Sequence, residues 1–105
     1  LTTFEPACVD DLAAILRWSL EHIQSEQGGA VYLRLSTRPI EQVPRSYSDA
    51  LRRDVIEGGY WLVPPGPGAA VAVVCCGAVL PEARDAHAQI VEDDPGAGLL
   101  VVTSP

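Results

Sequence analysis

The pattern that most constrains this fold is an apolar run, a helical segment and a second apolar run near the end of the chain. Ala70 to Cys75 is continuously apolar, which is typical of a strand covered on both faces. Gly77 ends that strand, a helix is predicted from about Leu80 to Glu92, and Leu99 to Val102 is a second apolar strand. Two strands joined by a helix in this way are expected to be parallel, with a right-handed crossover. The sequence therefore predicts a carboxyl-terminal β-α-β unit within a partial three-layer α/β fold.

The first third of the chain predicts a helix followed by a strand. Asp10 and Asp11 stand early, where carboxylates complement the positive helix end. Gly28 is expected to stop the helix, and Ala30 to Ser36 alternates as a strand does. Helical spacing places one apolar stripe along the helix: Leu12, Ile15, Leu16, Leu20 and Ile23.

The stretch from Thr37 to Tyr47 is predicted to be a linker, here called the connection. Pro39 and Pro44 exclude a central strand or a helix interior between them. A short helix is expected from about Ser48 to Ile56, with the Ser48 side chain as its cap. A short strand follows at Tyr60 to Val63, and a proline- and glycine-rich loop comes after it.

Charge and composition exclude several classes of function. The chain of 105 residues carries seven basic and fourteen acidic residues, a formal charge of −7, which disfavours nucleic-acid binding. No apolar run approaches the roughly 20 residues needed to span a bilayer, so no membrane association is expected. Three cysteines, two of them adjacent, form neither a disulfide framework nor a zinc pattern, and a reduced, cytoplasmic protein fits them best. Because the chain lacks methionine, we expect that both ends are cut from something longer.

The residues alone predict no catalytic group and no metal site. His22 and His87 lack acidic or cysteine neighbours at ligand spacing. The turn at Gly77 lacks the further glycines of a dinucleotide-binding loop. Arg34 and Arg38 would share one face, on the order of 13 Å apart, if the strand continued through Thr37. An arginine at the carboxyl end of a parallel strand can bind an anionic group, and a salt bridge with this acidic protein is the other explanation.

Four blocks of the sequence resemble consecutive parts of the transketolase superfamily: GGAVYLRLSTRPI, EGGYWLV, AVAVVCCGAVLPEARDAHAQI and GLLVVTSP. Within that superfamily they look most like the homodimeric, decarboxylating first component of the pyruvate dehydrogenase complex. The resemblance implies three parts. Residues 1–38 correspond to the end of the pyrimidine-binding domain, residues 39–57 to the inter-domain linker, and residues 58–105 to the start of the carboxyl-terminal domain.

The resemblance also implies a parent enzyme that uses thiamine diphosphate and Mg²⁺, works as a homodimer and engages a lipoyl acyltransferase component. The family's catalytic and cofactor-binding motifs lie outside this chain, so no catalytic residue and no bound cofactor are expected here. Only Arg38 carries over, because Thr37-Arg38 resembles the Thr-Arg step of transketolases, whose arginine meets the sugar phosphate. Pro39 departs from the transketolase pattern, and the pyruvate dehydrogenase type typically lacks this arginine.

Three classes of protein therefore stay open at this stage. In the first, the chain is a fragment of a thiamine-diphosphate enzyme, and the parent could act on 2-oxo acids, or on sugar phosphates as a transketolase or a 1-deoxyxylulose-5-phosphate synthase. A non-catalytic α/β interaction module and a small regulatory α/β domain are alternatives of other classes, and for both of them this chain would itself be the functional unit.

Overall fold

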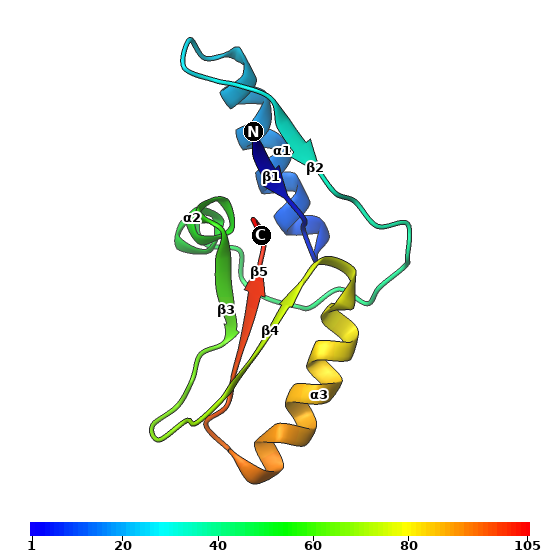
Figure 1. Cartoon of the computed structure of the whole chain (residues 1–105), viewed down its shortest axis with the longest axis vertical. Coiled ribbons are helices and arrows are strands. Elements are labelled where there is room, and N and C mark those ends of the chain that lie inside the picture. The colour runs from blue at the N-terminus through cyan, green and yellow to red at the C-terminus, as the bar shows by residue number, and fades with distance from the viewer.

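The computed structural model describes residues 1–105 and shows two α/β units joined end to end (Figure 1). The molecule measures 50 × 29 × 24 Å along its principal axes. The first unit contains β1 (Thr2–Phe4), α1 (Val9–Gln24) and β2 (Val31–Leu33). The second contains α2 (Asp49–Glu57), β3 (Gly59–Val63), β4 (Ala72–Cys76), a 3₁₀ turn (Gly77–Val79), α3 (Leu80–Asp93) and β5 (Gly98–Val102).

The predicted pair of parallel strands is confirmed. β4 and β5 run parallel, in register from Ala72 opposite Gly98 to Cys76 opposite Val102. β3 lies on the other side of β5 and is antiparallel to it, which gives the strand order β3-β5-β4. The chain thus has a mixed α/β fold with parallel strands in both sheets.

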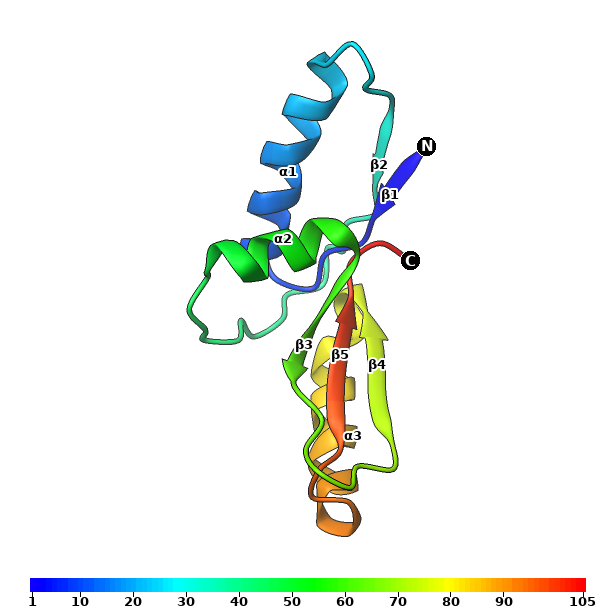
Figure 2. The same ribbon diagram turned by 90° about the vertical axis from the view of Figure 1, so that its left-hand side faces the viewer.

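The expectation that β4 is covered on both faces is not met within this chain. α3 covers one face of the second sheet, and the other face is open in Figure 2. On that open face the exposed fraction is 58% for Val74 and 44% for Trp61. β4 is an edge strand, and this chain leaves one of its two apolar faces uncovered.

The short helix α2 begins where the sequence predicts. The Ser48 hydroxyl accepts a hydrogen bond from the Leu51 amide over 3.1 Å, which satisfies one of the free N–H groups of the first turn. Gly58, at φ +129°, ends the helix. Only glycine adopts that angle without strain, so α2 passes directly into β3.

The first unit differs from expectation in three ways. β1 was not predicted, and it pairs in parallel with β2. β2 ends at Leu33 instead of reaching Ser36. The apolar stripe of α1 is largely exposed: Ile15 is buried, but Leu20 and Ile23 are more than half exposed. The buried face of α1 instead contains Asp11, Ala14, Ile15 and Ser19.

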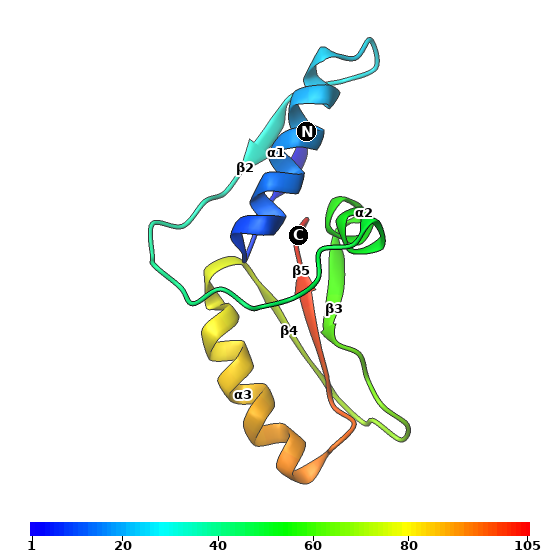
Figure 3. The same cartoon turned by 180° about the vertical axis from the view of Figure 1, so that it is seen from behind.

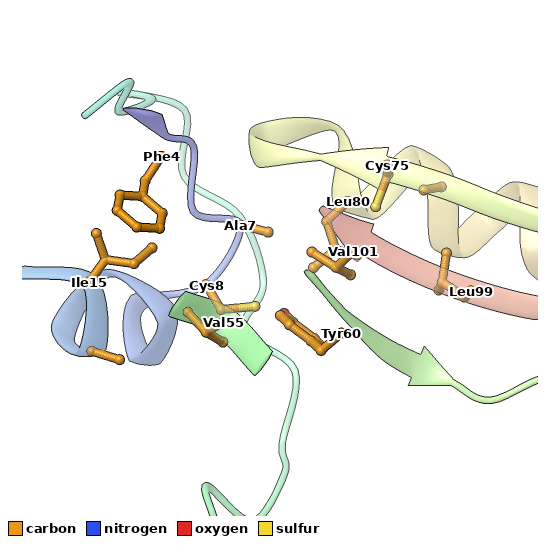
Figure 4. Close-up of a cluster of buried hydrophobic side chains, with 12 residues drawn as sticks. Phe4, Ala7, Cys8, Ile15, Val55, Tyr60, Cys75, Leu80, Leu99 and Val101 are labelled. Atoms are coloured by element: carbon orange, nitrogen blue, oxygen red, sulfur yellow. The ribbon is translucent and has the colours of Figure 1, made fainter. Parts of the chain in front are cut away.

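The two units share one hydrophobic core of twelve buried residues (Figure 4). Phe4, Cys8 and Ile15 of the first unit join Tyr60 and Val101 of the second. The segment after β5 strengthens this junction with hydrogen bonds. The Thr103 carbonyl accepts from the Glu5 amide over 2.8 Å, and the Ser104 hydroxyl donates to the Thr3 carbonyl over 2.7 Å. No helix of the structure is long and apolar enough to cross a membrane.

Candidate functional site at the strand ends

A crevice opens where the carboxyl ends of three strands from two different sheets meet. Glu5 follows β1, Arg34 follows β2, and Gly77 follows β4. The cavity between them has a volume of about 410 Å³ and also contains the hydroxyl groups of Ser36 and Thr37. Ligands of α/β proteins bind preferentially at this edge of a parallel sheet. The crevice is therefore the candidate functional site of the chain.

The floor of the crevice is formed by Glu5 and Gly77. The Glu5 carboxylate lies so close to Gly77 that a β-carbon there would be 2.5 Å from Glu5 Oε1. Arg34 Nη1 lies 3.8 Å from Glu5 Oε2, and its side chain is 72% exposed. Arg34 is therefore held only loosely, and its guanidinium remains available to an anion in the crevice.

Arg38 does not share a strand face with Arg34, because β2 ends before it. Its amide donates to the Ser36 hydroxyl over 3.0 Å, which turns the chain away from the sheet. Its Nη2 lies 2.6 Å from Glu82 Oε1 on α3, and its Nη1 donates to the Ala78 carbonyl over 3.1 Å. Arg38 therefore bridges the connection and the start of α3.

The Arg38–Glu82 ion pair is exposed to solvent. The side chains are 48% and 58% exposed, and the hydrogen bond from Arg38 lowers the pKa of Glu82. Exposed pairs of this kind contribute little to stability, about 0–1 kcal/mol. A dianion could therefore displace Glu82 from Arg38 at small cost. Arg38 also borders a cleft of about 510 Å³ between the connection and α3, together with Arg84.

A buried polar cluster connects the two units. Asp11 on α1 is fully buried and contacts Arg45 of the connection, with 2.5 Å between Oδ1 and Nη2. The Tyr60 hydroxyl on β3 donates to Asp11 Oδ2 over 2.8 Å. The Arg45 guanidinium lies over the rings of Tyr60 and Tyr47, 4.8 and 5.4 Å from their centroids. Three distant segments therefore meet around one buried carboxylate.

Burial and charge both act on this cluster. Burial, the Asp11 charge and the hydrogen bond to Asp11 strongly raise the pKa of Tyr60. Burial, with a smaller contribution from Asp11, also raises the pKa of Tyr47 to about 12. No motif in the sequence pointed to this cluster. The one available signal was Asp11 itself, because a carboxylate beside an apolar stripe requires a partner if its face is buried.

The thiols and histidines form no reactive or metal-binding group. Burial, with the nearby charge of Glu5, raises the pKa of Cys76 to about 11, which disfavours the thiolate. His22 stacks on Trp18 with centroids 4.5 Å apart. His87 Nε2 lies 2.9 Å from the Ala97 carbonyl oxygen. No three His, Cys, Asp or Glu side chains are grouped so that they could hold a metal ion.

The fold is that of an α/β segment of known architecture. No protein-family model and no curated protein sequence matches the chain. Among solved structures, two crystal structures of variant transketolases from Pichia stipitis match it with a TM-score of 0.75 and 20% identity. One of those two is a complex with fructose-6-phosphate. Each match covers 98% of this chain and 14% of the transketolase chain. The chain thus has the fold of a segment of transketolase and spans about one seventh of that protein's length.

Proposed function

We propose that this chain is the joining segment of a thiamine-diphosphate-dependent enzyme of the transketolase superfamily. One observation carries the proposal: the structural match covers 98% of the chain, and so spans both units and their connection. A chance likeness of one βαβ unit would not reproduce the way in which the second unit is joined to the first. In this proposal residues 1–38 end the pyrimidine-binding domain, residues 39–57 are the linker and residues 58–105 begin the carboxyl-terminal domain.

For the parent enzyme we propose a 2-oxo acid dehydrogenase of the pyruvate dehydrogenase type, which forms a homodimer in the cytoplasm and delivers its product to a lipoyl acyltransferase. A transketolase or 1-deoxyxylulose-5-phosphate synthase acting on sugar phosphates is the second candidate. The matched structures are transketolases, so the fold fits this second candidate at least as well. Arg34 directly follows β2, and Arg38 lies farther along the connection; either guanidinium could bind a carboxylate or a phosphate bidentately.

The residues of this chain do not fit a metal–diphosphate site by themselves. The crevice contains one carboxylate, Glu5, which already faces Arg34, and no group of possible metal ligands occurs elsewhere. When bound to the parent enzyme, thiamine diphosphate would supply the carbanion chemistry. Its ligands and those of Mg²⁺ are expected in the parent outside these 105 residues. What this chain would contribute is Arg34 in the crevice and Arg38 at the neighbouring cleft.

A direct experiment is to determine the reading frame on both sides of the chain and to assay the complete product. We expect a long upstream frame with a Gly-Asp-Gly run followed by Asn, and activity that requires thiamine diphosphate and Mg²⁺. Turnover of pyruvate with an artificial electron acceptor would identify the first candidate. Ketol transfer between sugar phosphates, or condensation of pyruvate with a sugar phosphate, would identify the second. A short frame that encodes little beyond these residues would contradict the proposal.

One observation favours a non-catalytic interaction module instead. The open sheet face presents Trp61 and Val74, and exposed apolar patches often mark protein interfaces. The same frame determination separates the two functions, because a module needs no cofactor-binding sequence upstream.

A further inference from the structure

We propose that a cavity between the connection, β3 and α3 binds a small carboxylic acid that has an apolar body. This site is separate from the crevice at the strand ends and goes beyond the proposed function. The cavity has a volume of about 400 Å³, within the usual range of small-molecule sites, about 300–1,000 Å³. Its wall combines apolar and basic side chains: Val43, Leu62 and Leu99, and Arg45, Arg84 and His87.

The side chains that line the cavity carry positive charge, although the protein as a whole is acidic. No carboxylate lines it, although the chain contains fourteen acidic residues and carries a charge of −7. By contrast, the cleft beside Arg38 includes Glu41 and Asp85 along with its two arginines. Arg45 is paired with Asp11, so Arg84 supplies the uncompensated charge that attracts an anion, and the low dielectric of apolar walls strengthens that attraction.

Arg45 has donors that the protein leaves unused. Its side chain is only 10% exposed, and Asp11 binds Nη2. The tyrosine rings cover the faces of its guanidinium, while Nε and Nη1 are buried without an acceptor. Buried donors normally have partners, and an unpaired one points to an acceptor supplied from outside the protein. Arg45 lies at the wall of the cavity, so an anion there would be beside this charge.

Arg84 supplies a guanidinium that a ligand can reach. Five of the seven arginines form ion pairs: Arg17, Arg34, Arg38, Arg45 and Arg52. Arg84 forms none, and it is exposed on α3. Its fork can bind a carboxylate bidentately. His87 Nε2 donates to the Ala97 carbonyl, so Nδ1 of the neutral ring is an acceptor and Arg84 alone supplies the reachable donors.

The apolar wall determines the rest of the ligand. Leu62 is half-buried and packs against the core, and Val63 is 38% exposed, so these two residues offer apolar surface to a ligand. A carboxylate held by Arg84 would place its body over these two residues. Short branched or aromatic monocarboxylates have that shape, whereas a sugar phosphate would bring hydroxyl groups against leucine and lose their hydration.

The test is a ¹H–¹⁵N NMR titration of the 105-residue chain with phenylacetate, with phenylacetamide as the neutral control of the same shape. We expect saturable shifts at Val43, Leu62, Arg84 and His87 with phenylacetate, and binding at least about tenfold weaker with the amide. Equal binding of acid and amide would show an apolar cavity without anion recognition and would overturn the proposal. Shifts confined to other residues, or no saturation at millimolar concentrations, would overturn it as well.

Two arginine variants complete the experiment. Arg84→Gln should weaken phenylacetate binding about tenfold, and its exposure means that the fold should be retained. Arg53→Gln is the matched control, because Arg53 is the other arginine without an ion pair and lies on α2, away from the cavity. If both variants weaken binding equally, the effect is one of net charge, and the site assignment is wrong.

Discussion

The carboxylate of Glu5 fills the space in which a side chain on Gly77 would begin. A β-carbon on Gly77 would lie 2.5 Å from Glu5 Oε1 and 2.8 Å from Glu5 Cγ. Gly77 also has φ +62°, a left-handed conformation that other residues adopt at a cost. The turn from β4 toward α3 therefore requires glycine at position 77, because the Glu5 side chain of the first unit packs directly against it.

We expect Gly77→Ala to lower the free energy of unfolding by about 1–3 kcal/mol, because it combines backbone strain with a clash against Glu5. Urea denaturation followed by circular dichroism measures the change. Gly29→Ala is the control, since nothing lies within 4 Å of a β-carbon there and its φ is ordinary. If Gly77→Ala and Gly29→Ala are equally stable, the contact between Glu5 and the turn does not exist in solution.

Replacing only one partner of the Asp11–Arg45 pair should lower the free energy of unfolding strongly. Arg45→Ala would leave a fully buried carboxylate unpaired, a loss of about 3–5 kcal/mol. Such a loss is a large part of the stability of a small domain, about 5–15 kcal/mol. In the same denaturation assay Arg52→Ala should cost less than about 1 kcal/mol, because its pair with Asp49 is exposed.

Removing both partners gives a sharper result. The double variant Asp11→Leu, Arg45→Met replaces the ions by apolar groups, so it should lose much less than the sum of the two single variants. Additive losses would mean that the two side chains act independently, which contradicts the 2.5 Å contact between them.

The local elements of the fold and the parallel β4–β5 pair were predictable, and the other strand partners were not. Ser48 indicated the start of α2, and the runs around Gly77 indicated β4, α3 and β5, because capping and periodicity act between near neighbours in sequence. β1 escaped prediction because three residues are too few to show alternation, and its partner β2 is almost thirty positions away. Likewise, nothing local determines that β3 pairs with β5.

The buried face of α1 could not be predicted from the sequence either. Periodicity groups Leu16, Leu20 and Ile23 on one stripe, but it does not decide which stripe faces the core. Here the core takes the face with Asp11, because Arg45 and Tyr60 supply partners for its carboxylate. The Arg34–Arg38 prediction depended on a continuing strand, and the turn at Ser36 ended that strand early.

Stability should fall above about pH 10, the pKa of tyrosine in an unfolded chain. The folded protein keeps Tyr60 protonated because burial and the Asp11 charge raise its pKa. Ionisation of the unfolded chain then favours unfolding, by up to about 1.4 kcal/mol per pH unit for one group. Below about pH 10 both states are protonated, and this contribution stays constant.

Urea midpoints measured between pH 8 and pH 11 test this dependence. Tyr60→Phe should flatten the decline, whereas Tyr32→Phe, which alters an exposed ring, should leave it unchanged. The thiol of Cys76 adds to the decline in both variants, since its pKa is also raised, to about 11. Equal slopes for wild type and Tyr60→Phe would show that Tyr60 is solvated.

The 105-residue chain should not bind thiamine diphosphate by itself. No group of metal ligands occurs in it, and the cofactor's diphosphate needs such a cation. Calorimetric titration with the cofactor and Mg²⁺ should therefore give no saturable heat. A dissociation constant below roughly 10 μM, about −7 kcal/mol, would require a site that this structure does not contain.

Variants of Arg38 in the complete parent enzyme would distinguish a substrate-binding role of this residue from a structural role. If it binds the anionic end of the substrate, Arg38→Ala should raise KM more than it lowers kcat, the pattern of lost ground-state binding. The loss should be about 1.5–3 kcal/mol, typical of hydrogen bonds to a charged group. Arg38→Lys should recover only part, because an ammonium cannot form the bidentate fork.

Glu82→Gln supplies the decisive comparison, because Glu82 is the present partner of Arg38 at 2.6 Å. A substrate anion and Glu82 compete for one guanidinium, so Glu82→Gln should leave KM unchanged or lower it. A purely structural ion pair predicts something else: Arg38→Ala and Glu82→Gln would both keep wild-type kinetics and lower the melting temperature by similar amounts. A higher KM for Arg38→Ala together with an unchanged or lower KM for Glu82→Gln would establish Arg38 as a substrate contact. Equal losses of stability without a kinetic effect would show that Arg38 only holds the connection against α3.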